Sequence, residues 1–435
     1  MSDGSAGRQE DRFKESRPWQ DLDRMLSVDD ARERILDSIV QCEPVPVGIT
    51  DCHGLILAQD VVADAPVPPF RNSAMDGYAV RHRDIEFASA DLPVSLNVIG
   101  NLPAGQEAGQ SPAEGDAIRI MTGAVMPDEA DTVVRFEETD DPGLPEESGG
   151  PESTSVQIYR APGRGANVRE AGEDLAQGER VLEAGHAIGA AALGVIASVN
   201  LTEVKVIPRP VVGILATGDE VVDPGEPIRP GQIRNSNNFT IAGLVREAGG
   251  VPEIIGIAGD TASSIREHLA DVSRYDLLIT SGGVSLGDYD VVKDVLQTEG
   301  SIDLWQVRIK PGKPMAFGRI GTVPLIGLPG NPVAAYVAFL QFATPAIRKM
   351  RGAKDAPSRN IRAKLLCEHE NRGQRRHFVR GVYREYGGEL VVEPVATQGS
   401  GVLSAVVRSN CFFVIPETVT HAPAGMTVDV LPHDH

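Results

Sequence analysis

The chain has 435 residues, a formal net charge of −20 and a sequence pI near 4.9. This length exceeds the size at which single hydrophobic cores stop growing, so it predicts about two to four domains. The negative charge would repel nucleic-acid phosphates and anionic membrane surfaces, which excludes both as general partners. A polyanionic ligand could bind only where the local charge is an exception to this overall negative charge.

The cysteine pattern and the N-terminus favour a cytoplasmic protein with reduced thiols. The four cysteines include no C-x-x-C pair and the nine histidines no H-E-x-x-H, so neither a disulfide framework nor a zinc site is expected. The N-terminus lacks the apolar run of a signal peptide. The most apolar stretches, residues 189–199 and 334–342, are shorter than the roughly 18 residues that a membrane-spanning helix needs.

The first half of the chain predicts a tail, a helix and a small β domain. Residues 1–22 are too polar to pack and predict a disordered tail. Apolar residues then recur at helical spacing from Val28, with Ser27 and Asp29 as candidate caps. Residues 54–138 are rich in valine and isoleucine and broken by proline and glycine, which predicts a small β domain of short strands.

From residue 209 the pattern changes to strands that alternate with helices, which favours a mostly parallel sheet with helices on both faces. The expected strands are 211–216, 251–257, 277–280 and 323–327, and the expected helices are 238–248, 262–272, 291–299 and 332–350. Beyond residue 355 short strands return.

The expected fold class is therefore multidomain α/β plus β: a central three-layer α/β domain, flanking small β domains and an N-terminal mixed α+β region. The expected boundaries are 1–22 for the tail, 23–60 with 160–208 for an α+β linker domain, 61–159 for a small β domain with a mobile acidic loop at 140–155, 209–354 for the α/β domain, and 355–435 for a C-terminal β domain.

Two of the eight lysines, Lys310 and Lys313, lie in one six-residue segment, whereas residues 15–204 contain no lysine. Lysine supplies a compact positive charge that suits a phosphate or another oxyanion. The alternative is an ordinary solvated charge run, but the rigid Pro311-Gly312 between the lysines weakens that interpretation. The segment therefore predicts an anion site.

Polar and glycine-rich turns follow the predicted strands, and in open α/β sheets ligands bind at the carboxyl ends of strands. These turns are Thr217-Gly-Asp-Glu220, Gly259-Asp260, Ser281-Gly-Gly-Val-Ser285 and Leu328-Pro-Gly-Asn-Pro332. Each alone predicts only a turn, but four turns with the two lysines favour one binding cleft. In the last turn Asn331 is a good helix N-cap and Pro332 suits the first helical turn, so we expect exposed amides for a phosphate there.

The same cleft is expected to collect carboxylates, which would repel an anionic ligand unless a cation lay between them. The acids are Asp219, Glu220, Asp260, Asp288 and Asp290, of which Asp288 more simply fits a cap or a surface charge. We therefore infer a Mg²⁺-like ion with oxygen ligands.

A G-x-S-x-G match at Gly283-Val-Ser-Leu-Gly287 also allows a serine hydrolase with Ser285 as its nucleophile. Gly282 before the match and Asp288-Tyr-Asp290 after it, in place of an immediate helix, argue against that alternative.

Several longer strings occur together in one order, and in that order the sequence resembles the molybdopterin molybdenumtransferase family, of the MoeA and gephyrin E-domain type. The strings are Asn72-Ser-Ala-Met-Asp-Gly-Tyr78, Arg119-Ile-Met-Thr-Gly-Ala124, Gly172-Glu-Asp174, Thr217-Gly-Asp-Glu220, Ser281-Gly-Gly-Val-Ser285, Lys310-Pro-Gly-Lys-Pro314 and Gly327-Leu-Pro-Gly-Asn-Pro332. The resemblance runs from about Val28 to the end of the chain.

The resemblance implies that molybdate is inserted into adenylylated molybdopterin, with Mg²⁺-dependent release of AMP. It also implies a homodimer whose cleft joins the α/β domain of one subunit to the first-half β domain of the other, and it raises the adenylyltransferase and acceptor molybdoenzymes as partners. The implied catalytic residues are Asp76, Thr122, Asp174, Glu220, Asp260 and Asp290, with Glu220, Asp260 and Asp290 holding the metal. The implied substrate-binding residues are Ser281, Gly282, Gly283, Ser285, Lys310, Lys313, Pro329, Gly330, Asn331, Arg380 and Ser400.

Two alternatives stay open. One is the related molybdopterin adenylyltransferase, whose fold the α/β domain alone resembles. The other is a gephyrin-like scaffold without turnover. The sequence also leaves open whether molybdate or tungstate is preferred, because both are tetrahedral dianions of similar size.

Overall fold

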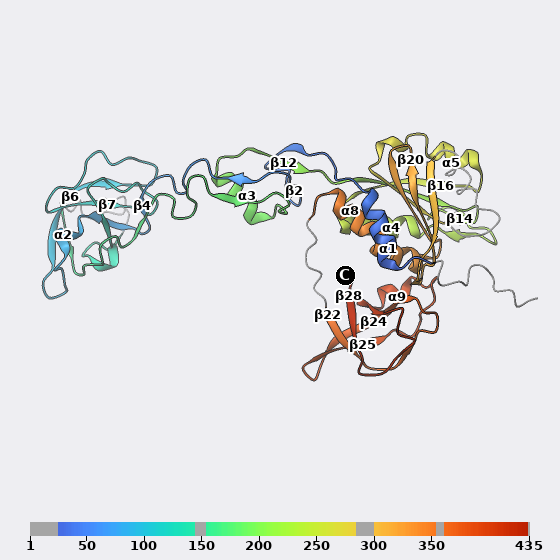
Figure 1. Ribbon diagram of the computed structural model, residues 1–435. Coiled ribbons are helices and arrows are strands. Elements are labelled where there is room, and N and C mark those ends of the chain that lie inside the picture. The colour runs from blue at the N-terminus through green and yellow to red at the C-terminus, as the bar shows by residue number, and fades with distance from the viewer. Residues whose placement is uncertain (1–24, 144–153, 284–299, 354–360, 434–435) are drawn as a thin grey trace, which may run out of the picture.

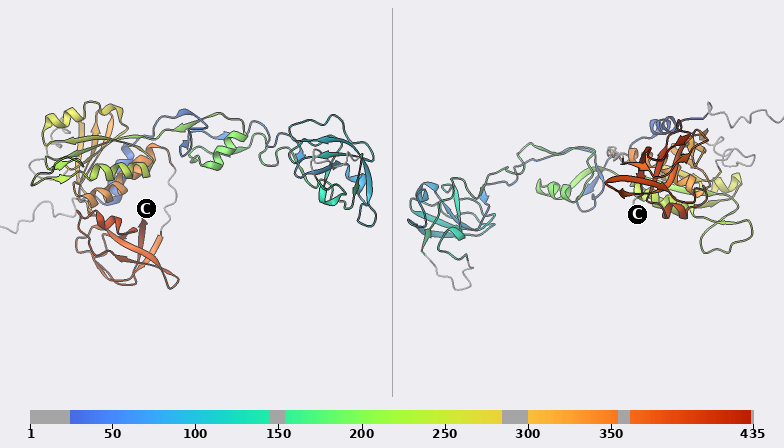
Figure 2. Two further views of the ribbon diagram at one scale, coloured as in Figure 1. Left: turned by 180° about the vertical axis from the view of Figure 1, so that it is seen from behind. Right: turned by 90° about the horizontal axis from the view of Figure 1, so that it is seen from below.

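The computed structural model describes residues 25–143, 154–283, 300–353 and 361–433. The expected tail, the expected helix at 291–299 and most of the acidic loop lie outside these ranges. Figures 1 and 2 show an elongated chain from three sides, with a β domain at one end, a slender middle part, and a larger body in which a helix-flanked sheet adjoins a second β domain. In the described part, no helix is both long and apolar enough to cross a membrane.

The larger body is built on a six-stranded mixed sheet in the order β16-β13-β17-β21-β20-β18. Its parallel strands are β13 (Val211–Thr217), β16 (Val251–Ala258), β17 (Leu277–Ser281) and β21 (Val323–Leu328). The antiparallel strands are β18 (Gly300–Gln306) and β20 (Pro314–Ile320). The parallel strands confirm the sequence prediction, whereas β18 and β20 were not predicted, since Pro314 and Gly318 interrupt the apolar pattern of β20.

Apolar side chains cover both faces of this sheet. Ile214 belongs to a core shared with Phe339 and Phe342, whereas its neighbour Leu215 packs with Ile265 in another core. This alternation is expected because successive strand residues face opposite ways. The first core holds α1 (Val28–Ser38), α4 (Asn237–Ala248), α7 (Pro332–Ala338) and α8 (Thr344–Met350), and the second holds α5 (Ala262–His268).

The predicted helix at 332–350 is continuous, but its middle turn is a π-helix instead of an α-helix. Between α7 and α8, residues Phe339–Ala343 form a π-helix. Its two phenylalanines, Phe339 and Phe342, are fully buried in the core. Fully burying such side chains stabilises the fold by about 1.5–3 kcal/mol each.

Helix α1 begins with a capping box. Ser27 Oγ accepts a hydrogen bond from the Asp30 amide at 3.0 Å, and the Asp30 carboxylate accepts one from the Ser27 amide at 3.4 Å. Of the two predicted caps, Ser27 is thus confirmed. Asp29 is not the cap, because its carboxylate binds Arg376 instead.

The N-terminal half forms two separate parts joined by paired connections (Figure 1). The far domain is a five-stranded sheet of β8 (Thr132–Arg135), β5 (Gly77–Val80), β7 (Asp116–Ile120), β6 (Val94–Leu102) and β9 (Ser155–Ile158), with a short helix α2 (His82–Ile85) and a 3-10 turn at Phe136–Glu138. The middle part contains β1 (Val45–Gly48), β12 (Glu203–Ile207), β2 (Ile56–Leu57) and α3 (Ala190–Ser198), and the pair β3 (Val61–Val62) with β11 (Arg180–Leu182). The pair β4 (Asn72–Ser73) with β10 (Val168–Arg169) belongs to the far domain, where Val168 packs against the core (Figure 1). The chain therefore runs out to the far domain and back again.

The C-terminal domain is a closed barrel. Strand β24 pairs with β25 on one side and with β26 on the other, and β22 and β28 complete the circuit. The strands are β22 (Ile361–Leu365), β24 (Arg376–Tyr386), β25 (Glu389–Pro394), β26 (Cys411–Ile415) and β28 (Thr427–Pro432), with a pair β23 (His369–Glu370) and β27 (His421–Ala422) and a short helix α9 (Ser404–Val407). Short strands were predicted beyond residue 355, and the structure has them there.

Strand β19 (Ile309–Lys310), which precedes β20 in the chain, joins the barrel rather than the sheet. It runs parallel to the start of β24, with Ile309 opposite Arg376 and Lys310 opposite His377. This pairing brings the predicted lysine segment to the junction of the two domains.

Arg376 fastens the barrel to α1. Its guanidinium donates to both carboxylate oxygens of Asp29, at 2.9 and 2.7 Å, and through Nε to Glu417 at 3.0 Å. These hydrogen bonds from Arg376 hold the pKa of Asp29 below its ordinary value. One arginine thus connects two parts of the chain that are more than three hundred residues apart.

The substitution Arg376→Ala should lower stability by about 1–3 kcal/mol, because it leaves the partly buried Glu417 without its cation. A thermal melt measures the effect. Arg362→Ala is the matched control, since its pair with Asp429 is 3.7 Å long and both side chains are mostly exposed. An equal melting temperature for Arg376→Ala and the unchanged protein would contradict the role of Arg376 in holding the barrel against α1.

Candidate active site

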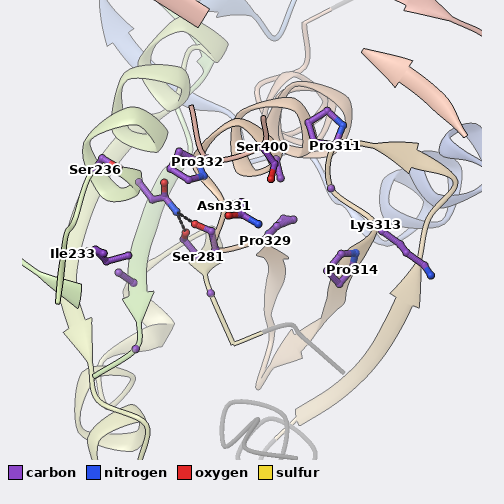
Figure 3. Close-up of a pocket in the computed structure, with 18 of the residues that line it drawn as sticks. Ile233, Ser236, Ser281, Pro311, Lys313, Pro314, Pro329, Asn331, Pro332 and Ser400 are labelled. Atoms are coloured by element: carbon purple, nitrogen blue, oxygen red, sulfur yellow. Dashed lines mark hydrogen bonds between the residues drawn. The ribbon is translucent and has the colours of Figure 1, made fainter. Parts of the chain in front are cut away.

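A cavity of about 1110 Å³ lies between the sheet and the barrel. Its walls come from the turns after β13, β17 and β21, from the segment that joins β19 to β20, and from barrel residues (Figure 3). The structure brings to this cavity most of the residues that the sequence predicted: Glu220, Asp260, Ser281, Gly282, Gly283, Lys310, Lys313, Pro329, Gly330, Asn331, Arg380 and Ser400. Ser285 and Asp290 lie outside the described residues.

Three predicted residues do not reach this cavity within one chain. Asp76 and Thr122 line a different cavity, of about 660 Å³, in the far β domain. There Asp76 Oδ1 accepts hydrogen bonds from the Thr122 amide at 2.6 Å and from the Thr122 hydroxyl at 2.7 Å. These bonds lower the pKa of Asp76. Asp174 is exposed on the strand-poor segment between β10 and β11.

The cavity gathers positive charge. Lys310 and Lys313 both line the cavity and are half-buried. The barrel residue Arg375, which was not predicted, also lines the cavity. Burial lowers the pKa of both lysines, and the nearby charge of Arg375 lowers it further. The two lysines therefore share one hollow with a third cation, as an anion site requires.

Arg380 contributes a buried charge from the barrel wall. Its side chain is 1% exposed, and Nη2 makes one long hydrogen bond of 3.4 Å to the Thr397 carbonyl. Within the described residues, Nε and Nη1 have no hydrogen-bond partner. A buried guanidinium with unfilled donors is costly, and an anionic ligand would supply the missing acceptors.

Gln398 holds the Arg380 backbone in place. Its side-chain oxygen accepts from the Arg380 amide at 3.2 Å, and its nitrogen donates to the Arg380 carbonyl at 2.8 Å. The side-chain nitrogen also donates to the Val395 carbonyl. The chain just before Ser400 is thereby fixed against β24.

Carboxylates lie on the sheet side of the cavity. Asp219 Oδ1 accepts from the Asp260 amide at 3.1 Å, and the Asp219 amide donates to Asp260 Oδ2 at 3.5 Å, so the turns after β13 and β16 are tied together. Glu220 and Asp260 line the cavity and are exposed. Among the described residues, no three His, Cys, Asp or Glu side chains form a metal-binding group. Two carboxylates fit Mg²⁺, which keeps several waters and takes further oxygens from phosphates.

The start of α7 differs from its prediction. Asn331 occupies the N-cap position and Pro332 the first turn, but the Asn331 side chain makes no capping hydrogen bond. The amide of Val333 donates instead to the carbonyl of Ser400, at 2.9 Å. The barrel therefore caps this helix, and that amide is not free for a phosphate. A cap from a residue so distant in sequence leaves no local signal.

Glycine is required where the turns meet. Gly282 has a φ of 96°, and a Cβ there would lie 2.7 Å from the Thr217 carbonyl oxygen. Asn237, at the start of α4, donates to Ser281 Oγ at 2.6 Å and to the Gly330 carbonyl at 2.8 Å (Figure 3). Asn237 was not predicted, although the polar string Asn235-Ser-Asn-Asn238 before the helix is a usable signal.

His377 was also missed by sequence reasoning. It lines the cavity, is 4% exposed, and shares a 3.1 Å hydrogen bond with His369. Burial, followed by the charge of Lys310, lowers the pKa of His377 from 6.5 to about 3. The imidazole is therefore neutral at physiological pH.

His377 should make the protein less stable in mild acid. Unfolded His377 takes up a proton near pH 6.5, whereas the folded group stays neutral down to about pH 3. Between these values the unfolded state binds more protons, so stability falls as the pH drops. In melting experiments at pH 7 and pH 4, His377→Gln should lose less stability than the unchanged protein. The exposed His53, changed to Gln, is the control; equal losses for all three proteins would contradict the expectation.

Known protein families match most of this chain. The sequence matches family models for the MoeA N-terminal region (domain I and II) over residues 26–200, the probable molybdopterin binding domain over residues 213–349, and the MoeA C-terminal region (domain IV) over residues 362–433. The family resemblance predicted from the sequence motifs is thereby confirmed.

Relatives and solved structures span almost the whole chain. A protein of Haemophilus influenzae named molybdopterin molybdenumtransferase is 35% identical, covering 94% of this chain and 99% of the relative. Molybdopterin molybdenumtransferase 2 of Mycobacterium tuberculosis is 35% identical, covering 93% and 99%. The crystal structure of the molybdopterin biosynthesis moea protein from Pyrococcus horikosii has a TM-score of 0.78 at 29% identity, covering 94% and 99%. This chain therefore belongs to the molybdopterin molybdenumtransferase family of transferase enzymes.

Proposed function

We propose that this enzyme inserts molybdate into adenylylated molybdopterin and releases AMP, a step of molybdenum cofactor biosynthesis. The names of its relatives support this biosynthetic role. The observation that carries the proposal is the cavity between sheet and barrel, where Lys310, Lys313 and the buried Arg380 meet in a chain of net charge −20. Positive charge concentrated in an acidic protein favours an anionic substrate.

The substrates match this cavity in charge and size. Adenylylated molybdopterin carries a phosphoanhydride between its pterin phosphate and AMP, and molybdate is a tetrahedral dianion. Lysine ammonium groups suit such oxyanions as point charges, while a guanidinium suits them as a planar donor of two hydrogen bonds. The volume of about 1110 Å³ is at the upper end of the range for small-molecule sites, as a nucleotide joined to a pterin requires.

Glu220 and Asp260 would hold Mg²⁺, with Asp290 as the further predicted ligand outside the described residues. When bound, the ion would neutralise phosphate charge and lower the pKa of a coordinated water. In the reaction, water adds to the phosphorus and the bridging P–O bond breaks, so AMP leaves and the pterin keeps its own phosphate. Lys310 and Lys313 would stabilise the negative charge that develops on the phosphoryl oxygens.

Asp76, Thr122 and Asp174 enter this proposal through a second subunit. Within one chain, Asp76 and Thr122 lie in the far β domain, which Figure 1 shows at the opposite end from the sheet. A homodimer in which the partner's far domain approaches the cavity would reunite the predicted catalytic residues. The elongated shape of the chain supports such an arrangement.

A turnover assay tests the proposed function. Incubated with adenylylated molybdopterin, molybdate and Mg²⁺, the protein should release AMP and produce molybdenum cofactor, which can activate a molybdenum-free acceptor enzyme. Consumption of ATP and molybdopterin instead would indicate an adenylyltransferase. No turnover of either substrate set by the folded protein would indicate a scaffold.

The substitution Lys313→Ala should weaken binding of adenylylated molybdopterin or molybdate by about tenfold or more, because a hydrogen bond to a charged group contributes about 1.5–3 kcal/mol. Calorimetric titration measures the dissociation constants. Lys364→Ala is the control, because Lys364 lies on the barrel surface and pairs with Glu389. Unchanged dissociation constants for both ligands would refute the role of Lys313.

A further inference from the structure

Two adjacent arginines at the start of β24 have different surroundings. Arg376 is occupied by two carboxylates, as described above. Arg375 has no ion pair and no side-chain hydrogen bond with any residue in the part of the chain that the structure describes, although it is half-buried. It lines the cavity. Asp29 and Glu417 therefore bind Arg376, whereas Arg375 lines the cavity without a carboxylate partner among the described residues.

The backbone around Arg375 is firmly placed. Gln374 before it has a positive φ of 46°, and Arg376 after it donates its amide to the Arg308 carbonyl at 2.8 Å. Strand β19 then runs alongside β24, with Lys310 opposite His377. Arg375 thus belongs to a segment held against the lysine segment and not to a loose surface loop.

The charge of Arg375 acts on three cavity groups. It lowers the pKa of Lys310, of Lys313 and of His377. All four residues line the same cavity. His377 is neutral, so it does nothing to offset the repulsion among the three cations. A ligand of opposite charge would relieve that repulsion.

We propose that Arg375 is a substrate-binding residue that binds a tetrahedral oxyanion together with Lys310 and Lys313 of the adjoining segment. The oxyanion is either a phosphoryl group of adenylylated molybdopterin or molybdate. A planar guanidinium donates two parallel hydrogen bonds to such a group, which a lysine does not. Bound substrate would then join the barrel to the sheet. This inference rests on the proposed function and adds a residue to it.

Steady-state kinetics of Arg375→Gln and Arg375→Lys test the inference. Arg375→Gln should raise KM for one substrate by about tenfold or more, with little change in melting temperature. Arg375→Lys should recover only part of the loss. A raised KM for molybdate identifies molybdate as the bound oxyanion, and a raised KM for the pterin identifies its phosphoryl group. Arg372→Gln is the control, since Arg372 lies on the same segment, is 88% exposed and pairs with Glu370.

The inference is overturned if both KM values of Arg375→Gln match those of the unchanged protein. Direct binding measurements test the role of Arg375 separately from the proposed function. If the unchanged protein shows no turnover, the proposed function fails, and titrations with AMP and with molybdate alone decide the role of Arg375. Weaker binding of either by Arg375→Gln supports the role, and equal binding of both removes it.

Discussion

The site depends on positive charge held at the junction between two domains. Arg380 is buried in the barrel wall with donors that no described residue fills, and Lys310, Lys313 and Arg375 lie around the same cavity. Such charges are costly to bury without partners. The rest of the larger body is the scaffold that keeps these four cationic side chains around one cavity. The cavity leaves room for an anion that would balance their charge.

That scaffold consists of a few long-range contacts between sheet and barrel. Strand β19 leaves the sheet to pair with β24, the Ser400 carbonyl caps α7, and Arg376 ties α1 to the barrel. The first two contacts involve the cavity-lining residues Lys310 and Ser400, and the third holds the barrel next to the cavity residue Arg375. A ligand bound across the cavity would interact with elements that these contacts already position, which limits the entropy lost on binding.

Local sequence signals predicted the repetitive parts of the fold well. The parallel strands and the helix at 332–350 follow from apolar runs separated by turn residues, and the lysine pair was recognisable from its spacing in a lysine-poor chain. The convergence of the lysines and the strand-end turns on one cavity was therefore predictable. Strand β20 was hidden because Pro314 and Gly318 break its pattern, although the tertiary pairing with β21 overrides them.

The remaining site features depend on contacts that no local pattern encodes. The side chain of Asn331 does not cap α7 because a barrel carbonyl does so. Arg375 and Arg376 look alike in the sequence, and only the positions of Asp29 and Glu417 decide which of them is left for a ligand. The hydrogen bonds between Asp76 and Thr122 also join residues distant in sequence, and within one chain this pair lies in the far domain, away from the lysines.

The most direct test of this account is a crystal structure of the protein with AMP and molybdate. An oxyanion is expected in the cavity between sheet and barrel, within hydrogen-bond distance of the Arg380 guanidinium and facing Lys310 or Lys313. Density for both ligands elsewhere on the protein, with the Arg380 donors still without an anion, would contradict it.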